Sequence, residues 1–162
     1  MSSLQKHTIP SFRLQNGKVI PLTLTYQVFG KSLDSAPVVL VNHSLTGNSV
    51  VSGEDGWWSD IIGPKKLIDT EVYSIIAFNF PGNGFDDHFL VEYKDLVLRD
   101  ISEAFKIALD ALHISELYAA IGGSIGGALA WEMAVSYPQF IQNIIPIACH
   151  WEASDWILAN VL

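Results

Sequence analysis

A serine enclosed by glycines is the residue of this chain best suited to covalent chemistry. Ser124 lies in the run Gly122-Gly123-Ser124-Ile125-Gly126, which fits the pattern G-x-S-x-G. In this pattern the serine hydroxyl is a nucleophile, and the glycines make room for the sharp turn that exposes it. We therefore predict that Ser124 is a catalytic nucleophile, with Gly122 and Gly126 as the glycines of its turn.

The segments on either side of Ser124 are those that such a turn requires. Residues 117–121 form a short apolar run suited to a buried strand, and residues 128–137 have helical spacing that ends before Pro138. A serine between a strand and a helix is the nucleophile elbow of α/β-hydrolase folds. The alternative, a glycine-rich connector with an incidental serine, leaves this context unexplained.

A second glycine-bearing loop is expected to stabilise negative charge beside Ser124. In α/β-hydrolases the loop after an early strand and the residue after the nucleophile each supply a backbone N–H to the oxyanion hole. Here these donors are predicted to be Leu45, or a neighbour in residues 42–47, and Ile125. His43 precedes the nucleophile, whereas the catalytic histidine of this fold comes late in the chain. We therefore interpret His43 as a residue that orients the loop.

The remaining pattern is strands first and then strands alternating with helices. Residues 9–14 and 19–29 flank Asn16-Gly17, a pair favoured in type I′ turns, so an antiparallel hairpin is expected. The order predicts an α/β fold of the α/β-hydrolase type, with a mostly parallel sheet led by that hairpin. The other predicted elements are strands at 38–41, 73–80 and 144–148, an amphipathic helix within 95–112, and a short helix or loop-helix at 58–68.

Composition and charge exclude several classes of partner. The 162 residues are 49% hydrophobic and 16% charged, with a formal net charge of −8, which argues against nucleic-acid binding. The longest apolar region is broken by glycines and by Glu132, so no membrane partner is expected. With a single cysteine, Cys149, and no signal peptide, we expect a cytoplasmic protein. Asp86, Asp87 and His88 lie in a turn without further ligands, and no metal site is predicted.

Seven motifs, spread in order over nearly the whole chain, resemble the homoserine O-acetyltransferase family of methionine biosynthesis, a branch of the α/β-hydrolase superfamily. They are Phe12-Arg13-Leu14-Gln15-Asn16-Gly17, Tyr26-Gln27-Val28-Phe29-Gly30, His43-Ser44-Leu45-Thr46-Gly47, Gly56-Trp57-Trp58, Ile62-Gly63-Pro64, Ile68-Asp69-Thr70 and Gly122-Gly123-Ser124-Ile125-Gly126-Gly127.

The resemblance implies an acetyl group transferred from acetyl-CoA to the hydroxyl of homoserine through an acyl-serine intermediate. Acetyl-CoA is then a substrate, no cofactor is permanently bound, and a homodimer is compatible with the family. The sequence does not identify the residues that bind the acyl donor. Residues 153–160 resemble the start of the helical lid inserted in this family.

One departure from the family bears on the substrate. After the 73–80 strand, the family usually has a glycine-rich loop with a Ser-Thr-Gly-Pro run. This chain has Pro81-Gly82-Asn83-Gly84, which is closer to the loop of general α/β-hydrolases. A serine esterase or related hydrolase, with water as the acceptor, is therefore the alternative enzyme.

A second departure concerns the catalytic triad. The fold's triad runs serine, acid, histidine, but after Ser124 the candidates His150 and Asp155 occur in the opposite order. We therefore expect residues 1–162 to be the N-terminal part of a single α/β-hydrolase domain, with the lid beginning near residue 153 and the acid and histidine beyond Leu162. A complete small protein with His150 as its base, and a non-catalytic scaffold without the triad, are the other interpretations.

Overall fold

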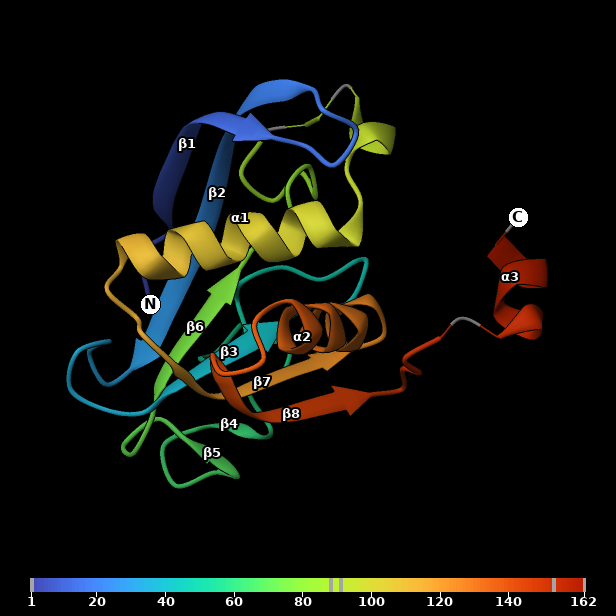
Figure 1. Cartoon of the computed structure of the whole chain (residues 1–162). Coiled ribbons are helices and arrows are strands. Elements are labelled where there is room, and N and C mark those ends of the chain that lie inside the picture. Colours follow the sequence, from blue (N-terminus) through green and yellow to red (C-terminus); the bar gives the residue numbers. More distant parts are fainter. Residues whose placement is uncertain (1, 88, 91, 153, 162) are drawn as a thin grey trace.

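The computed structural model describes residues 2–87, 89–90, 92–152 and 154–161. Its main sheet has the strand order β1-β2-β6-β3-β7-β8 (Figure 1). The pairs β1–β2 and β2–β6 are antiparallel, and the pairs from β6 to β8 are parallel. This confirms the predicted α/β fold with its leading hairpin. The strands are β1 (Gln5–Arg13), β2 (Val19–Gly30), β3 (Val38–Asn42), β6 (Ser74–Phe78), β7 (Leu117–Gly123) and β8 (Ile141–Ile147).

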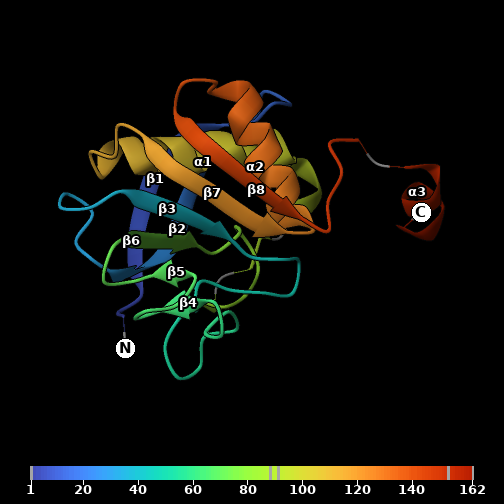
Figure 2. The same ribbon diagram turned by 90° about the horizontal axis from the view of Figure 1, so that it is seen from below.

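Helices α1 (Leu98–Ala111) and α2 (Ile125–Ser136) cover one face of the sheet, and the short strands β4 (Ile62–Gly63) and β5 (Ile68–Asp69) lie on the other side (Figure 2). A 3₁₀ turn, η1 (Tyr93–Asp95), precedes α1. The apolar stripe predicted from helical spacing faces the core, where its members Ile101, Ala104, Phe105, Ala108 and Leu109 are buried.

Strands β3 and β6 are buried along their whole length because both faces of the sheet are covered there. Leu40 packs into the core beneath the helices, whereas its neighbours Val39 and Val41 pack into a second core with Ile62 on the opposite face. The central strands therefore hold a fixed position, and the loops that leave them start from rigid points.

The type I′ turn predicted at Asn16-Gly17 is wrong. A type I′ turn needs a positive φ at both central residues, but Asn16 lacks one, whereas Gly17 has a φ of 87°. The N–H of Gly17 donates to the carbonyl of Leu14 (2.8 Å), and the N–H of Leu14 donates to the carbonyl of Lys18 (2.8 Å), which closes a three-residue loop. The Asn16 side chain accepts from the Lys18 N–H and donates to Asp95, and these bonds favour the observed loop.

The short helix predicted within residues 58–68 is also wrong. The carbonyl of Trp58 accepts hydrogen bonds from the N–H groups of Ile61 (3.0 Å) and Ile62 (2.8 Å), and the chain then enters β4. Pro64 has no N–H to continue a helix. Strand β4 instead pairs in parallel with β5.

Helix α3 (Asp155–Val161) stands apart from the sheet, beyond the carboxyl ends of β7 and β8 (Figures 1 and 2). A helix was expected over residues 153–160, of which Ala153 lies outside the described residues. That α3 begins a lid stays a prediction. Within the described part of the chain, no helix is long and apolar enough to cross a membrane.

Candidate active site

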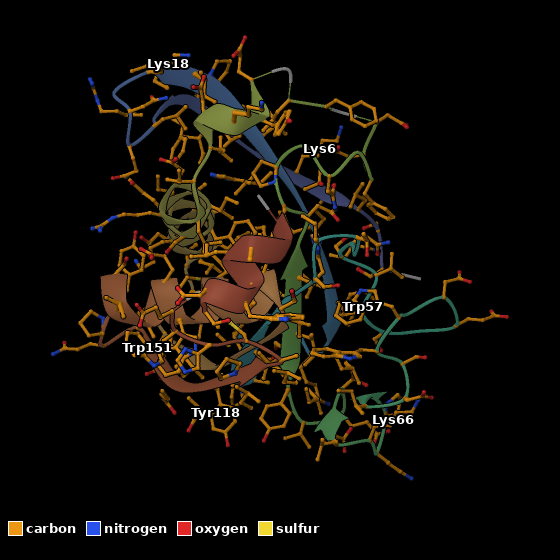
Figure 3. The ribbon with its side chains drawn as sticks, turned by 90° about the vertical axis from the view of Figure 1, so that its right-hand side faces the viewer. Lys6, Lys18, Trp57, Lys66, Tyr118 and Trp151 are labelled. Atoms are coloured by element: carbon orange, nitrogen blue, oxygen red, sulfur yellow. The ribbon has the colours of Figure 1, made fainter. Side chains whose placement is uncertain are left out.

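Ser124 lies between the last residue of β7 and the first residue of α2. The predicted order of strand, turn and helix is therefore present. The turn is at the carboxyl edge of the parallel strands, where β3 also ends, because Asn42 is in register with Gly122. Figure 3 views the molecule from this side, with Trp57 and Trp151 on opposite sides of the strand ends. Active sites of open α/β sheets lie outside this edge.

The backbone of Ser124 is strained and its side chain is exposed. Its φ of 55° and ψ of −122° lie in a region that non-glycine residues rarely adopt, at a cost of about 1–3 kcal/mol. Three bonds hold the turn: the Ser124 N–H donates to the carbonyl of Ile147 (2.9 Å), and the Ser124 carbonyl accepts from Gly127 (2.9 Å) and Ala128 (3.0 Å). Among the residues that the structure describes, none is hydrogen-bonded to the Ser124 hydroxyl.

Two glycines make this turn sterically possible. A Cβ added at Gly122 would lie 2.4 Å from the carbonyl carbon and oxygen of Gly126. A Cβ added at Gly126 would lie 2.4 Å from the carbonyl oxygen of Asn42 and 2.6 Å from that of His43. A Cβ at Gly123 would meet nothing within 4 Å. Within the pattern G-x-S-x-G, Gly122 and Gly126 are therefore under steric constraint, whereas Gly123 is not.

The backbone N–H groups at both predicted oxyanion positions are without partners. Within the described ranges, the N–H groups of Leu45 and Ile125 make no hydrogen bond. Ile125 opens α2, whose N-terminus carries the positive end of the helix dipole. Gly126 touches the carbonyl groups of Asn42 and His43, so the loop that carries Leu45 starts against the first turn of α2. Unpaired N–H groups of this kind can donate to an oxyanion.

His43 is buried, and its two ring nitrogens are both bonded to the backbone. Its Nε2 accepts a hydrogen bond from the N–H of Phe80 (3.0 Å), so Nδ1 carries the proton and donates to the carbonyl of Ser44 (2.6 Å). Burial lowers the pKa of His43 below its ordinary value, although the bond to Ser44 partly opposes this shift. Neither nitrogen is placed to take a proton from Ser124, and this geometry supports a loop-orienting role.

The other candidate acid and base residues do not reach Ser124. The Nδ1 of the exposed His150 lies within hydrogen-bond distance of the carbonyl (3.1 Å) and the N–H (3.3 Å) of Glu152, and its ring lies against Trp151. Asp155 begins α3, away from the sheet. The described residues therefore supply no acid–base pair hydrogen-bonded to Ser124. His88 lies outside the described residues, and among those described no group of three or more His, Cys, Asp or Glu side chains could hold a metal ion.

A polar cluster is hydrogen-bonded to the Leu45 loop (residues 43–49), and the sequence alone did not predict it. It joins strand β2, the end of β6 and the loop after β3. The available signal was the polar residue Asn79 directly after the apolar strand 74–78. The cluster consists of Thr25, Gln27, Ser49, Asn79 and Asn83.

Comparison with known families agrees with this geometry. A family described as the alpha/beta hydrolase fold matches residues 37–161. The chain belongs to the α/β-hydrolase fold family. The arrangement of the sheet and its helices described above is thus that of an α/β-hydrolase.

The resemblance to homoserine O-acetyltransferases is also confirmed. This α/β-hydrolase chain is 31% identical to the homoserine O-acetyltransferase of Nautilia profundicola over 98% of its own length and 48% of that protein. In structure it is similar to esterase E22 (TM-score 0.86, 26% identity, 98% of this chain and 50% of that one). It is also similar to the homoserine O-acetyltransferase of Staphylococcus aureus (TM-score 0.81, 29% identity, 96% of this chain and 49% of that one). The chain spans about half the length of the curated relatives it matches.

Proposed function

We propose that the protein carrying this chain transfers an acetyl group from acetyl-CoA to the hydroxyl of homoserine. The observation that carries the chemistry is the exposed Ser124 hydroxyl on a strained turn, next to the unpaired N–H of Ile125. The choice of substrates is supported by the names of the relatives most similar in sequence.

In the first half-reaction, the Ser124 Oγ attacks the thioester carbonyl carbon, and its proton passes to a base. The N–H groups of Leu45 and Ile125 donate to the oxyanion of the tetrahedral intermediate, which stabilises the transition state more than the substrate. The C–S bond then breaks, and CoA leaves as its thiol. In the second half-reaction, the homoserine hydroxyl attacks the acyl-serine, which releases O-acetylhomoserine and restores Ser124.

Ser124 alone is a weak nucleophile at neutral pH and needs a base to activate it. Since neither His43 nor His150 is hydrogen-bonded to Ser124, we propose that the triad acid and histidine lie beyond Leu162. Residues 1–162 are then the N-terminal part of one domain, with α3 at the start of the lid. We further propose that the enzyme is cytoplasmic and acts on small molecules. It binds acetyl-CoA only as a substrate, and its assembly as a homodimer is compatible with the family.

A serine esterase is the second candidate, and one observation favours it. The loop after β6 reads Pro81-Gly82-Asn83-Gly84, as in general α/β-hydrolases, and the chain is similar in structure to esterase E22. In an esterase, water rather than homoserine attacks the acyl-serine. The two candidates therefore share the first half-reaction and differ in the second.

Product analysis with acetyl-CoA, in the presence and absence of homoserine, tests the proposal. A transferase yields O-acetylhomoserine and releases little free acetate, because water is kept from the acyl-serine. An esterase yields acetate at a rate that homoserine does not change. If neither O-acetylhomoserine nor acetate forms, and mass spectrometry detects no acetyl group on Ser124 with acetyl-CoA or with an activated acetyl ester, a non-catalytic scaffold replaces both candidates.

A further inference from the structure

The side chain of Asn79 uses its full hydrogen-bonding capacity inside the protein. Its Oδ1 accepts from the N–H of Ser49 (2.9 Å) and from the Asn83 Nδ2 (3.2 Å). Its Nδ2 donates to the Thr25 Oγ1 (3.0 Å) and to the Ser49 Oγ (3.1 Å). An amide has two donors and two acceptor positions, and all four are used here. Asn79 is 2% exposed, so water does not replace these bonds.

These bonds fix the far end of the Leu45 loop. Asn79 binds both the backbone and the side chain of Ser49, whose hydroxyl in turn donates to the Gln27 Oε1 (2.7 Å). The Asn83 Nδ2, which also donates to Asn79, lies 3.3 Å from the Gly47 carbonyl. Residues 47 and 49 are therefore fixed to the segment that follows β6, and Ser49 is also fixed to strand β2.

The near end of the same loop is fixed by His43 through its bonds to Phe80 and Ser44. Leu45 lies between the two fixed points, in a turn closed by the bond from the Gly47 N–H to the Ser44 carbonyl (2.9 Å). Its side chain is 73% exposed, so packing contributes little to its position. The direction of the Leu45 N–H thus depends on the polar anchors at either end.

We propose that Asn79 is a positioning residue for catalysis, which holds the 43–49 loop so that the Leu45 N–H points at the developing oxyanion. The inference rests on the proposed acyl chemistry at Ser124. A donor that is fixed before the reaction stabilises the transition state without reorganisation. A displacement of about 1 Å caused far from the reacting atoms can lower a rate by about 10²-fold.

The role requires an amide at this position. A carboxylate of the same shape has no donor for the Ser49 Oγ, whose own proton is already given to Gln27, whereas the Thr25 hydroxyl can turn to donate to it. It would also place an unpaired charge in a buried site. The near-isosteric substitution Asn79→Asp therefore breaks the pattern of bonds while leaving the volume unchanged.

The test compares Asn79→Asp with wild type in the protein that carries this chain. The measurements are the single-turnover rate of Ser124 acetylation, kcat, KM and the melting temperature. We expect acetylation and kcat to fall by roughly 10²-fold with little change in KM, at temperatures where the variant stays folded. Thr25→Ser, which keeps the hydroxyl, should retain the rate that Thr25→Val loses. The exposed Asn143→Ala, which removes one bond to the Tyr118 carbonyl, is the matched control.

Wild-type acetylation rates in folded Asn79→Asp would overturn the proposal, as would a loss of activity that only follows the unfolded fraction. If Asn79→Asp does not fold, Asn83→Ala is measured in its place; it removes the bonds of Asn83 to Gly47, Asn79 and the Phe85 N–H but leaves the bonds between Asn79 and Ser49. A wild-type protein without any acetyl-Ser124 would instead contradict the proposed function. Hydrogen exchange then tests the anchoring alone: faster exchange confined to residues 44–49 in Asn79→Asp supports it, and unchanged exchange overturns it.

Discussion

The backbone N–H of Ser124 donates to the carbonyl of Ile147 across 2.9 Å, which joins the serine turn to the last residue of β8. Gly123 and Ile147 are also in register across the parallel pair β7–β8. The position of the Ser124 hydroxyl is therefore set by two strands and a helix, and a change at the end of β8 acts on Ser124 through this bond.

Replacement of the hydroxyl tests the nucleophile. Ser124→Ala removes one exposed oxygen and leaves the Cβ, so the fold should persist while turnover and the acetyl adduct are lost. Intact-protein and peptide mass spectrometry with acetyl-CoA should detect one acetyl group, on Ser124, in wild type alone. An adduct on another residue, or undiminished activity of Ser124→Ala, would contradict the assignment.

The two glycine positions beside Ser124 form a matched pair. Gly126→Ala places a Cβ 2.4 Å from the Asn42 carbonyl oxygen, and such overpacking should lower the free energy of unfolding by about 1–3 kcal/mol. It should also reduce activity, because it separates the Leu45 loop from α2. Gly123→Ala meets no atom within 4 Å and should have little effect on stability. Denaturant titrations of both variants check this, and equal losses would show that the steric argument is wrong.

The Leu45 backbone should matter more than its side chain. Leu45→Pro deletes the N–H, and loss of one oxyanion donor typically lowers kcat by about 10²–10³-fold. Leu45→Met keeps the N–H and replaces a side chain that is largely exposed, so most activity should remain. Steady-state kinetics with thermal melts separate the two effects. Similar kcat values for Leu45→Pro and wild type would show that another residue of the loop supplies the N–H donor.

The buried His43 predicts a dependence of stability on pH. Its pKa is lowered in the folded protein, chiefly by burial, whereas in the unfolded chain it is about 6.5. Between these two values the unfolded state binds more protons, so the free energy of unfolding falls as the pH is lowered through this window. The full contribution is present above about pH 6.5.

Denaturant titrations of wild type and His43→Asn between pH 8 and pH 5 measure this effect. The variant should be less stable at pH 8, because the Phe80 N–H loses its partner, and its stability should depend less on pH. Equal slopes in the two proteins would show that His43 is not the group responsible. A variant with wild-type melting but with activity as low as that of Ser124→Ala would make His43 the catalytic base.

Asp100 joins α1 to the loop of the β1–β2 hairpin. Its buried carboxylate accepts hydrogen bonds from the N–H groups of Gln15 (2.8 Å) and Val97 (2.9 Å). Asp100→Ala leaves both donors unpaired, and each such group costs about 1–3 kcal/mol when buried. Glu103→Ala, which removes one exposed bond to Gln15, is the control and should be nearly neutral. Thermal melts of the two variants check the difference.

Local patterns in the sequence were sufficient to predict the elements next to Ser124. The period of the α1 stripe and the glycines around Ser124 are properties of neighbouring residues, and the structure has both features in place. The turn at Asn16 could not be predicted in this way, because its conformation is linked to Asp95, 79 residues later. The polar Asn79 after an apolar strand is a local signal, but its partners lie 30 and 54 positions away, so no local pattern identifies them.

The strained backbone at Ser124 also restricts which nucleophile this turn can carry. With a φ of 55° and a ψ of −122°, a second heavy atom on Cβ would collide with the adjacent backbone, since β-branched residues tolerate positive φ least. Serine and cysteine have one such atom, and threonine has two. In the proposed role of Ser124, a cysteine thiol therefore fits this turn as the serine hydroxyl does, whereas the branched side chain of threonine is disfavoured.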